Sequence, residues 1–117
     1  MSLAGPCIFC RVLANEVPAR EAYSGELVYA FHDLHPVAQV HVLVVPRQHV
    51  ADASQLGPQH GPLLVEMMHA ANTVAGQEGI AAGGYRLVFN VGRDSGAEVP
   101  HLHMHVLGGR RLGWPPG

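Results

Sequence analysis

The sequence predicts an α+β fold, in which an antiparallel β-sheet is packed on one side by a long helix. Only residues 58–78 carry a long helical pattern. One long helix between the strands is too few for a doubly wound parallel sheet. Short β-branched segments lie both before and after that helix. Two of the earlier segments are separated by Gly25-Glu26, a spacing typical of an antiparallel hairpin.

The elements before the long helix are expected to be short. Residues 8–14 predict a first helix, which the segment Asn15–Pro18 ends. The hairpin strands are expected at Glu21–Ser24 and Leu27–His32. His41–Pro46 reads His-Val-Leu-Val-Val-Pro, which predicts a β-branched strand that ends at the proline.

The long helix has one apolar stripe, and two strands are expected after it. The stripe consists of Leu63, Met67, Ala71 and Val74, with Leu64 and Met68 beside it. Pro62 suits the first turn, and Gly83-Gly84 ends the helical pattern. Strands are then predicted at Tyr85–Asn90 and Leu102–Leu107, followed by a tail over residues 108–117.

Length and charge restrict the classes of function. The 117 residues predict one domain, spanning residues 1–117. The net charge is −2, all seven basic residues are Arg and no block of like charge occurs, so we expect no nucleic-acid partner. No apolar run approaches the length of a membrane span, and the first residues lack the features of a secretory signal. A cytoplasmic protein is therefore expected.

Three histidines alternate with apolar residues near the C-terminus, in the run His101-Leu-His103-Met-His105. In a strand, alternate side chains share a face, so we expect the three imidazoles together on the exposed face of the sheet. Three chemical interpretations stay open: ligands of one metal ion, nucleophilic catalysis at phosphorus, or a surface strand with chance histidines. Catalysis is favoured, because a neutral imidazole is both a good nucleophile toward phosphorus and a good leaving group.

The only two cysteines, Cys7 and Cys10, have the spacing C-x-x-C. In a reducing compartment this spacing indicates metal binding or redox chemistry more than a structural disulfide. A thioredoxin-like redox pair is disfavoured because the βαβ context is missing. The remaining alternative is that both side chains are small buried apolar groups.

The segment His101–Arg110 resembles the signature of the histidine triad (HIT) family. The end of the chain, from Gly108-Gly109-Arg110 to Trp114-Pro-Pro-Gly117, is similar to the Hint branch of purine nucleoside phosphoramidases. Further matches are Cys7-Ile-Phe-Cys10, Phe31-His-Asp-Leu34, His41–Pro46 and Asn90. The resemblance covers nearly the whole chain in order. It implies a homodimer, in which two protomers form one joined sheet and each C-terminal tail, residues 108–117, reaches the partner's active site.

The resemblance also implies an activity. Purine nucleoside 5′-phosphoramidates, such as adenosine 5′-monophosphoramidate or lysyl-AMP, would be cleaved at the P–N bond, releasing AMP or GMP and an amine. The reaction would pass through a covalent nucleotidyl-His103 and would need no metal. The alternatives are dinucleoside polyphosphate hydrolysis or nucleotidyl transfer, a nucleotide- or zinc-binding regulatory module, and a metal-dependent phosphodiesterase.

Site residues are carried over from the family by position. His103 would be the nucleophile, His41 and His105 would contact the phosphate or the leaving group, and His101 would complete the triad. Asp33 would bind the ribose hydroxyls and Leu34 the base, while Asn90 would reach the sugar and phosphate. The remaining nucleotide contacts are expected from Gly96, Ala97, Glu98 and Trp114. Where Glu98 stands some relatives have a serine near the leaving group, so its carboxylate would favour a cationic amine.

A structural zinc site is the last implication of the resemblance. Its four ligands would be Cys7, Cys10, His49 and His101. Because all four positions of a tetrahedral ion would then be filled by the protein, the site would be structural rather than catalytic. It would tie the N-terminal segment, residues 1–20, to the histidine strand and orient His101 behind His103.

Overall fold

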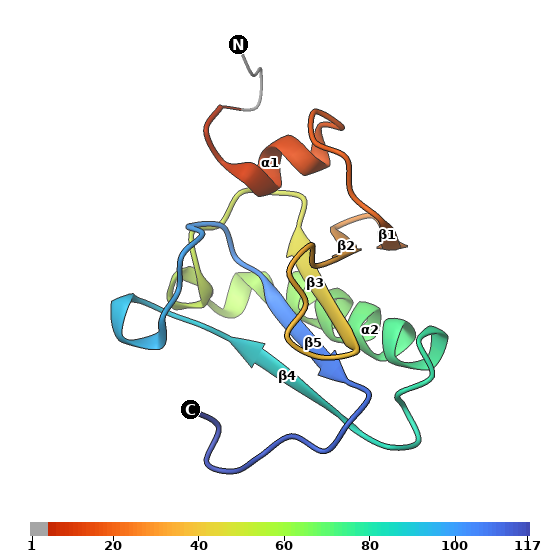
Figure 1. Cartoon of the computed structure of the whole chain (residues 1–117). Coiled ribbons are helices and arrows are strands. Elements are labelled where there is room, and N and C mark those ends of the chain that lie inside the picture. The colour runs from red at the N-terminus through yellow and green to blue at the C-terminus, as the bar shows by residue number, and fades with distance from the viewer. Residues whose placement is uncertain (1–4) are drawn as a thin grey trace.

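Five antiparallel strands form one sheet in the computed structural model, which describes residues 5–117 (Figure 1). The first four residues of the predicted N-terminal segment lie outside this part. The strand order is β1-β2-β3-β5-β4. The strands are β1 (Glu21–Ser24), β2 (Val28–His32), β3 (Val40–Pro46), β4 (Tyr85–Phe89) and β5 (Met104–Gly108). The predicted α+β class and its antiparallel sheet are confirmed.

The helices flank this sheet on its two faces. The short helix α1 (Ile8–Leu13) comes first, and the long helix α2 (Gly61–Gln77) lies between β3 and β4 in the chain. Three short 3-10 turns, Ala53–Gln55, Pro58–His60 and Arg93–Ser95, occur in the connecting loops. The segment 58–60, predicted as helix, forms one of these turns, in which the Gly57 N–H donates to His60 Nδ1.

Helix α2 covers one face of the sheet (Figure 1). The sheet side of this core is made by alternate residues of three strands: Val28, Ala30, Val42, Val44, Met104 and Val106. The helix contributes Met67, Ala70, Ala71, Val74 and Ala75. The predicted stripe therefore faces the core, while Leu64 and Met68 stay exposed. Each fully buried Val or Met side chain contributes about 1.5–3 kcal/mol of burial free energy, which makes this face the rigid base of the site.

Helix α1 packs on the opposite face. Phe9 and Val12 of α1 contact a second cluster of sheet residues: Phe31, Leu43 and Val45. Along β3 the two-residue period puts His41 on the same face as Leu43. Leu43 is paired with His105 of β5, so the histidines and α1 share one side of the sheet.

One expectation about the histidine run was wrong. Strand β5 begins at Met104, so His101 precedes it and the two-residue period does not apply there. His101 is fully buried rather than on the exposed face. The burial is compensated, because both ring nitrogens have polar neighbours: the Pro46 carbonyl at 3.0 Å and Cys7 Sγ at 3.3 Å.

No helix within residues 5–117 has the length and apolar character needed to cross a bilayer.

Candidate active site

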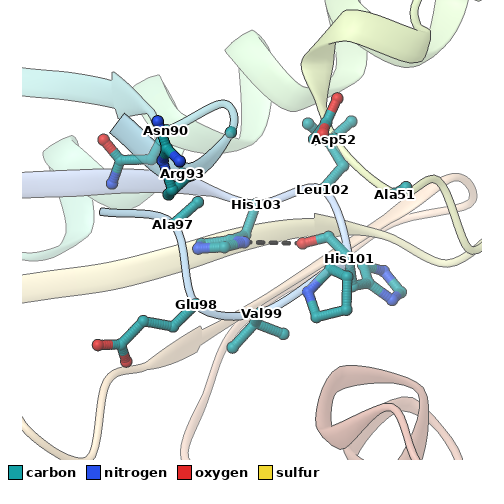
Figure 2. Close-up of a pocket in the computed structure, with 12 residues that line it drawn as sticks. Ala51, Asp52, Asn90, Arg93, Ala97, Glu98, Val99, His101, Leu102 and His103 are labelled. Atoms are coloured by element: carbon teal, nitrogen blue, oxygen red, sulfur yellow. Dashed lines mark hydrogen bonds between the residues drawn. The ribbon is translucent and has the colours of Figure 1, made fainter. Parts of the chain in front are cut away.

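The ring of His103 is oriented by its own chain. Its Nδ1 lies 2.7 Å from the carbonyl oxygen of His101 (Figure 2). A carbonyl can only accept, so the proton is on Nδ1 and the lone pair of the neutral ring is on Nε2. Phe9 of α1 packs edge-on against the same ring, with centroids 5.1 Å apart. The free nitrogen of His103 is therefore a nucleophile in a defined tautomer.

Two further histidines form a chain of defined tautomers. The Val37 N–H donates to His41 Nδ1 at 3.1 Å, so the proton of His41 is on Nε2. His41 Nε2 lies 2.8 Å from His105 Nδ1, which must accept. His105 consequently keeps its proton on Nε2 and can donate to a ligand. Its ring centroid lies 5.0 Å from that of His103, so a nucleophile and a hydrogen-bond donor stand side by side.

Burial keeps these rings neutral. Desolvation, together with the positive charges that His103 and His41 would carry, lowers the pKa of His105 to about 4. Desolvation also lowers the pKa of His41, against the opposing effect of the Asp33 carboxylate. At neutral pH both rings thus remain in the uncharged form that the tautomer chain requires.

Asp33, expected to bind the ribose hydroxyls, adjoins the histidine pair, and one of its carboxylate oxygens is already engaged. Oδ1 accepts from the His35 N–H at 2.8 Å, which is an ordinary turn interaction. Oδ2 lies 3.4 Å from His41 Nε2 and faces the two histidines. We call Asp33, His41 and His105 the aspartate–histidine cluster.

The four predicted zinc ligands are brought together. We call Cys7, Cys10, His49 and His101 the cysteine–histidine cluster; their ligand atoms all lie within 4.8 Å of one another. Cys7 Sγ lies 3.3 Å from His101 Nδ1, and Cys10 Sγ lies 3.2 Å from His49 Nδ1. Ligands of a tetrahedral zinc ion are separated by about 3.5 Å, given typical Zn–S and Zn–N lengths. His101 Nε2 donates to the Pro46 carbonyl, so Nδ1 carries the lone pair that a metal needs. The donor set therefore fits zinc.

The aspartate–histidine cluster does not fit a metal ion in the same way, although its three ligand atoms are equally close. The nitrogen that His41 turns toward its neighbours, Nε2, carries the proton because Nδ1 accepts from Val37. A metal ligand must offer a lone pair, so binding there would break this backbone hydrogen bond. The hydrogen bonds favour a proton-carrying chain at this position.

Three adjoining cavities lie near His103, and two of them are lined by it. The apolar cavity, about 280 Å³, lies under α1 and is lined by Phe9, Phe31, Asp33, Leu34 and Leu43 among others. The central cavity, about 180 Å³, is lined by His103, His105, Asn90, Gly96 and Ala97 among others. The polar cavity, about 300 Å³, is lined by Asp52, Asn90, Arg93, Glu98 and His103 among others (Figure 2). The central cavity shares residues with both neighbours and so connects them.

In the loop before His101, two of the three residues expected to contact the nucleotide use their backbone N–H groups within the loop. Gly96 has φ +81°, a left-handed conformation that favours glycine. Its N–H donates to the Arg93 carbonyl, and the Ala97 N–H donates to Ser95 Oγ. Among the described residues, the Glu98 N–H has no such partner and stays available to a ligand. The sequence did not reveal that the N–H groups of Gly96 and Ala97 are hydrogen-bonded within the loop itself.

The remaining predicted residues divide into two groups. Leu34 is 76% exposed and is one of the residues that line the apolar cavity. Trp114 is 82% exposed and lines none of the three cavities, so this chain does not bring it to its own site. Phe9, Phe31 and Leu43 line the apolar cavity but were not predicted. For Leu43 a signal existed, because it shares a strand face with His41.

Comparisons with known proteins agree with this geometry. The family model described as HIT domain matches residues 14–112. The purine nucleoside phosphoramidase of Escherichia coli is 40% identical over 111 residues, which cover 95% of this chain and 93% of that protein. An uncharacterised HIT-like protein of Synechococcus elongatus is 43% identical over 110 residues, covering 94% and 96%.

Solved structures give the same result. A HIT family hydrolase from Clostridium thermocellum superposes with a TM-score of 0.91 at 40% identity, covering 93% of this chain and 95% of that one. A HIT family hydrolase from Legionella pneumophila gives a TM-score of 0.92 at 39% identity, covering 96% and 100%. The histidine run, the fold and these matches together show that this chain belongs to the HIT domain family.

Proposed function

We propose that this chain hydrolyses the P–N bond of purine nucleoside 5′-phosphoramidates through a covalent nucleotidyl intermediate on His103. One observation carries the proposal: the His101 carbonyl holds the proton on Nδ1 of His103 and leaves the Nε2 lone pair free. The name of the E. coli relative, a purine nucleoside phosphoramidase, supports the choice of substrate.

The proposed reaction has two displacements at the same phosphorus atom. In the first, His103 Nε2 bonds to the α-phosphorus, the P–N bond to the amine breaks, and the amine nitrogen takes up a proton. The His105 Nε2–H, which the tautomer chain keeps in place, donates to the phosphoryl group or to the departing nitrogen. In the second, water attacks phosphorus, the bond to His103 breaks, and AMP or GMP is released.

The three cavities fit the parts of such a substrate. The apolar cavity offers aromatic and aliphatic walls to a purine base, with Phe9 and Phe31 packed edge-on at 5.6 Å. Asp33 lines both this cavity and the central one, where it could accept from ribose hydroxyls. The histidines of the central cavity would then meet the phosphate.

The arrangement disfavours a phosphodiesterase whose metal is held by the three histidines of the run. His101 turns its lone pair toward the cysteines, and His105 belongs to the other cluster. His103 would therefore act as the nucleophile and not as a ligand of a metal ion.

The decisive experiment mixes the protein with adenosine 5′-monophosphoramidate, quenches the reaction rapidly and analyses the chain by mass spectrometry. We expect an AMP adduct on His103, and a loss of at least about 10³-fold in kcat for His103→Ala. His69→Ala, an exposed position on α2, serves as a control that keeps both adduct and turnover. Full activity of His103→Ala would refute the mechanism, and absence of turnover in the unmodified protein would favour a nucleotide-binding module.

We also propose that the cysteine–histidine cluster binds a structural zinc ion. The ion would be held by all four side chains and would tie α1 to His101, whose carbonyl orients His103. Since no step of the proposed reaction involves it, its contribution is to the position of His103.

A homodimer is the third part of the proposal. Strand β4 is an edge of the sheet, and exposed apolar side chains lie on α2 and at the end of β4: Leu64, Val65, Met68, Phe89 and Val91. Pairing of two β4 edges would cover them. The Arg86 side chain donates to the Gly113 carbonyl and holds the tail along β4, from where Trp114 could extend to a partner. The cytoplasmic location stays a prediction.

A further inference from the structure

The Asp33 carboxylate faces both the central cavity and the histidine pair, His41 and His105. It lines that cavity together with His103 and His105, and its Oδ2 lies 3.4 Å from His41 Nε2. Within residues 5–117, this is the one ion-pair contact between a carboxylate and either ring of the pair. Glu98, the other acidic side chain that lines the central cavity, has no such contact there. Binding of ribose hydroxyls alone does not require a carboxylate beside His41.

The hydrogen bonds of the pair determine where an additional proton can go. Because the Val37 N–H occupies Nδ1 of His41, the proton of that ring stays on Nε2. In the neutral pair this N–H donates to His105 Nδ1 at 2.8 Å. An additional proton on His105 would lie on Nδ1 and would face the His41 N–H, which is repulsive. The charged pair therefore needs another acceptor, and Asp33 Oδ2 lies close enough to accept from His41.

The charge of Asp33 also favours a proton on the pair. Desolvation lowers the pKa of both rings, and the Asp33 carboxylate acts in the opposite direction at each of them. In the free protein the lowering effects prevail, so the pair is neutral at neutral pH. A phosphoramidate monoanion beside His105 would add a second negative charge. We therefore expect the pair to take up a proton when the substrate binds.

We propose that Asp33 is a positioning residue for proton transfer: its Oδ2 accepts the His41 N–H once His105 is charged, so that His105 can protonate the leaving amine. The inference rests on the proposed function, because it assigns a further role within the same reaction. In the first displacement, the proton on His105 Nε2 moves to the amine nitrogen as the P–N bond breaks. In the second, the same ring nitrogen takes a proton from the attacking water as the bond between phosphorus and His103 breaks. The pair thus returns to its starting charge after each turnover.

The test compares two derivatives of AMP that differ only in the leaving group. The propylamine phosphoramidate needs a proton on its departing nitrogen, whereas the 4-nitrophenyl ester releases a stable phenolate without one. We expect Asp33→Asn to lower kcat/KM about 10- to 100-fold for the phosphoramidate and only about two- to threefold for the ester. Any loss of ribose binding affects both compounds equally and cancels in the ratio. Asparagine retains an acceptor for the His35 N–H, so the turn is kept.

A control variant and a double variant assign the effect to its residues. Asp94→Asn removes the same charge from an exposed side chain that is paired with Arg93, so the ratio of the two kcat/KM values should equal that of the unmodified protein. In a His105→Asn background, Asp33→Asn should not change the ratio further, because Asp33 acts through His105. An effect of Asp33→Asn that is equally large with and without His105 would overturn the inference.

Two failures can be told apart. Equal losses for the phosphoramidate and the ester in Asp33→Asn would mean that the carboxylate acts only by binding the nucleotide, so the inference would fail while hydrolysis itself persists. If the unmodified protein does not hydrolyse the phosphoramidate, the proposed function fails instead.

Discussion

The two clusters of potential metal ligands look alike by distance and differ in where their protons are. In both, the ligand atoms lie within 4.8 Å of one another. In the cysteine–histidine cluster, a backbone carbonyl takes the Nε2 proton of His101 and leaves a lone pair facing the cysteines. In the aspartate–histidine cluster, a backbone N–H occupies the lone pair of His41 and leaves a proton facing the cluster. The spacing of the ligand atoms alone therefore does not identify a metal site. The backbone group that is hydrogen-bonded to the other ring nitrogen of the histidine decides whether the facing nitrogen offers a lone pair to a metal ion or carries a proton.

Both clusters also adjoin the same side chain, that of His103. The backbone of His101, a member of the first, accepts from His103 Nδ1 at 2.7 Å. The ring of His105, a member of the second, is 5.0 Å from the His103 ring. We expect substitutions in the cysteine–histidine cluster to lower activity by displacing His103. Substitutions in the aspartate–histidine cluster should lower the rate of the reaction directly.

The largest effect should come from His105→Asn. Asparagine can still accept from His41 but has no donor at the place of Nε2, so kcat should fall by about 10²- to 10⁴-fold. The zinc content, measured by mass spectrometry of the native chain, should not change. Loss of zinc from this variant would mean that the aspartate–histidine cluster is a second metal site and would break the comparison.

The next effect should come from Cys10→Ser, which removes one zinc ligand. If the four ligands share the binding free energy of a structural zinc, its affinity should fall by about 10²- to 10³-fold. Competition with a chromophoric chelator measures this, and Ser54→Ala is a control outside the cluster. The chelator-treated protein should retain His103 chemistry at a reduced rate. An unchanged zinc affinity would show that the geometric fit is accidental.

The sequence predicts most of this fold because its signals are local. The β-branched run at β3, the stripe of α2 and the glycines after it each depend on neighbouring residues alone. The position of His101 was missed because it depends on where β5 begins. That boundary is set by contacts distant in sequence, such as the Leu102 N–H donating to the Val50 carbonyl. The two-residue period of a strand depends only on neighbouring positions, so it contains no information on these contacts.

The site was predicted unevenly for a similar reason. The histidines and cysteines stand out by chemical type, and a family resemblance supplied their grouping. Phe9 lines the site because α1 folds over the sheet, and nothing in its local pattern reveals that. The tautomers of the histidines are even harder to predict from the sequence, because they depend on single backbone groups such as the Val37 N–H.

The smallest effect concerns stability in acid, and it contrasts the clusters once the zinc has been removed by chelation. Burial holds the pKa of His105 at about 4, whereas an unfolded histidine titrates near 6.5. Between these values the unfolded chain binds a proton that the folded chain does not, so the free energy of unfolding should decrease as pH falls from 6.5 to 4. At about 1.4 kcal/mol per pH unit, His105 accounts for a loss of roughly 3 kcal/mol at most. Urea denaturation at several pH values should therefore give a shallower slope for His105→Asn than for the unmodified chain. Equal slopes would mean that protonation of His105 does not govern stability in acid.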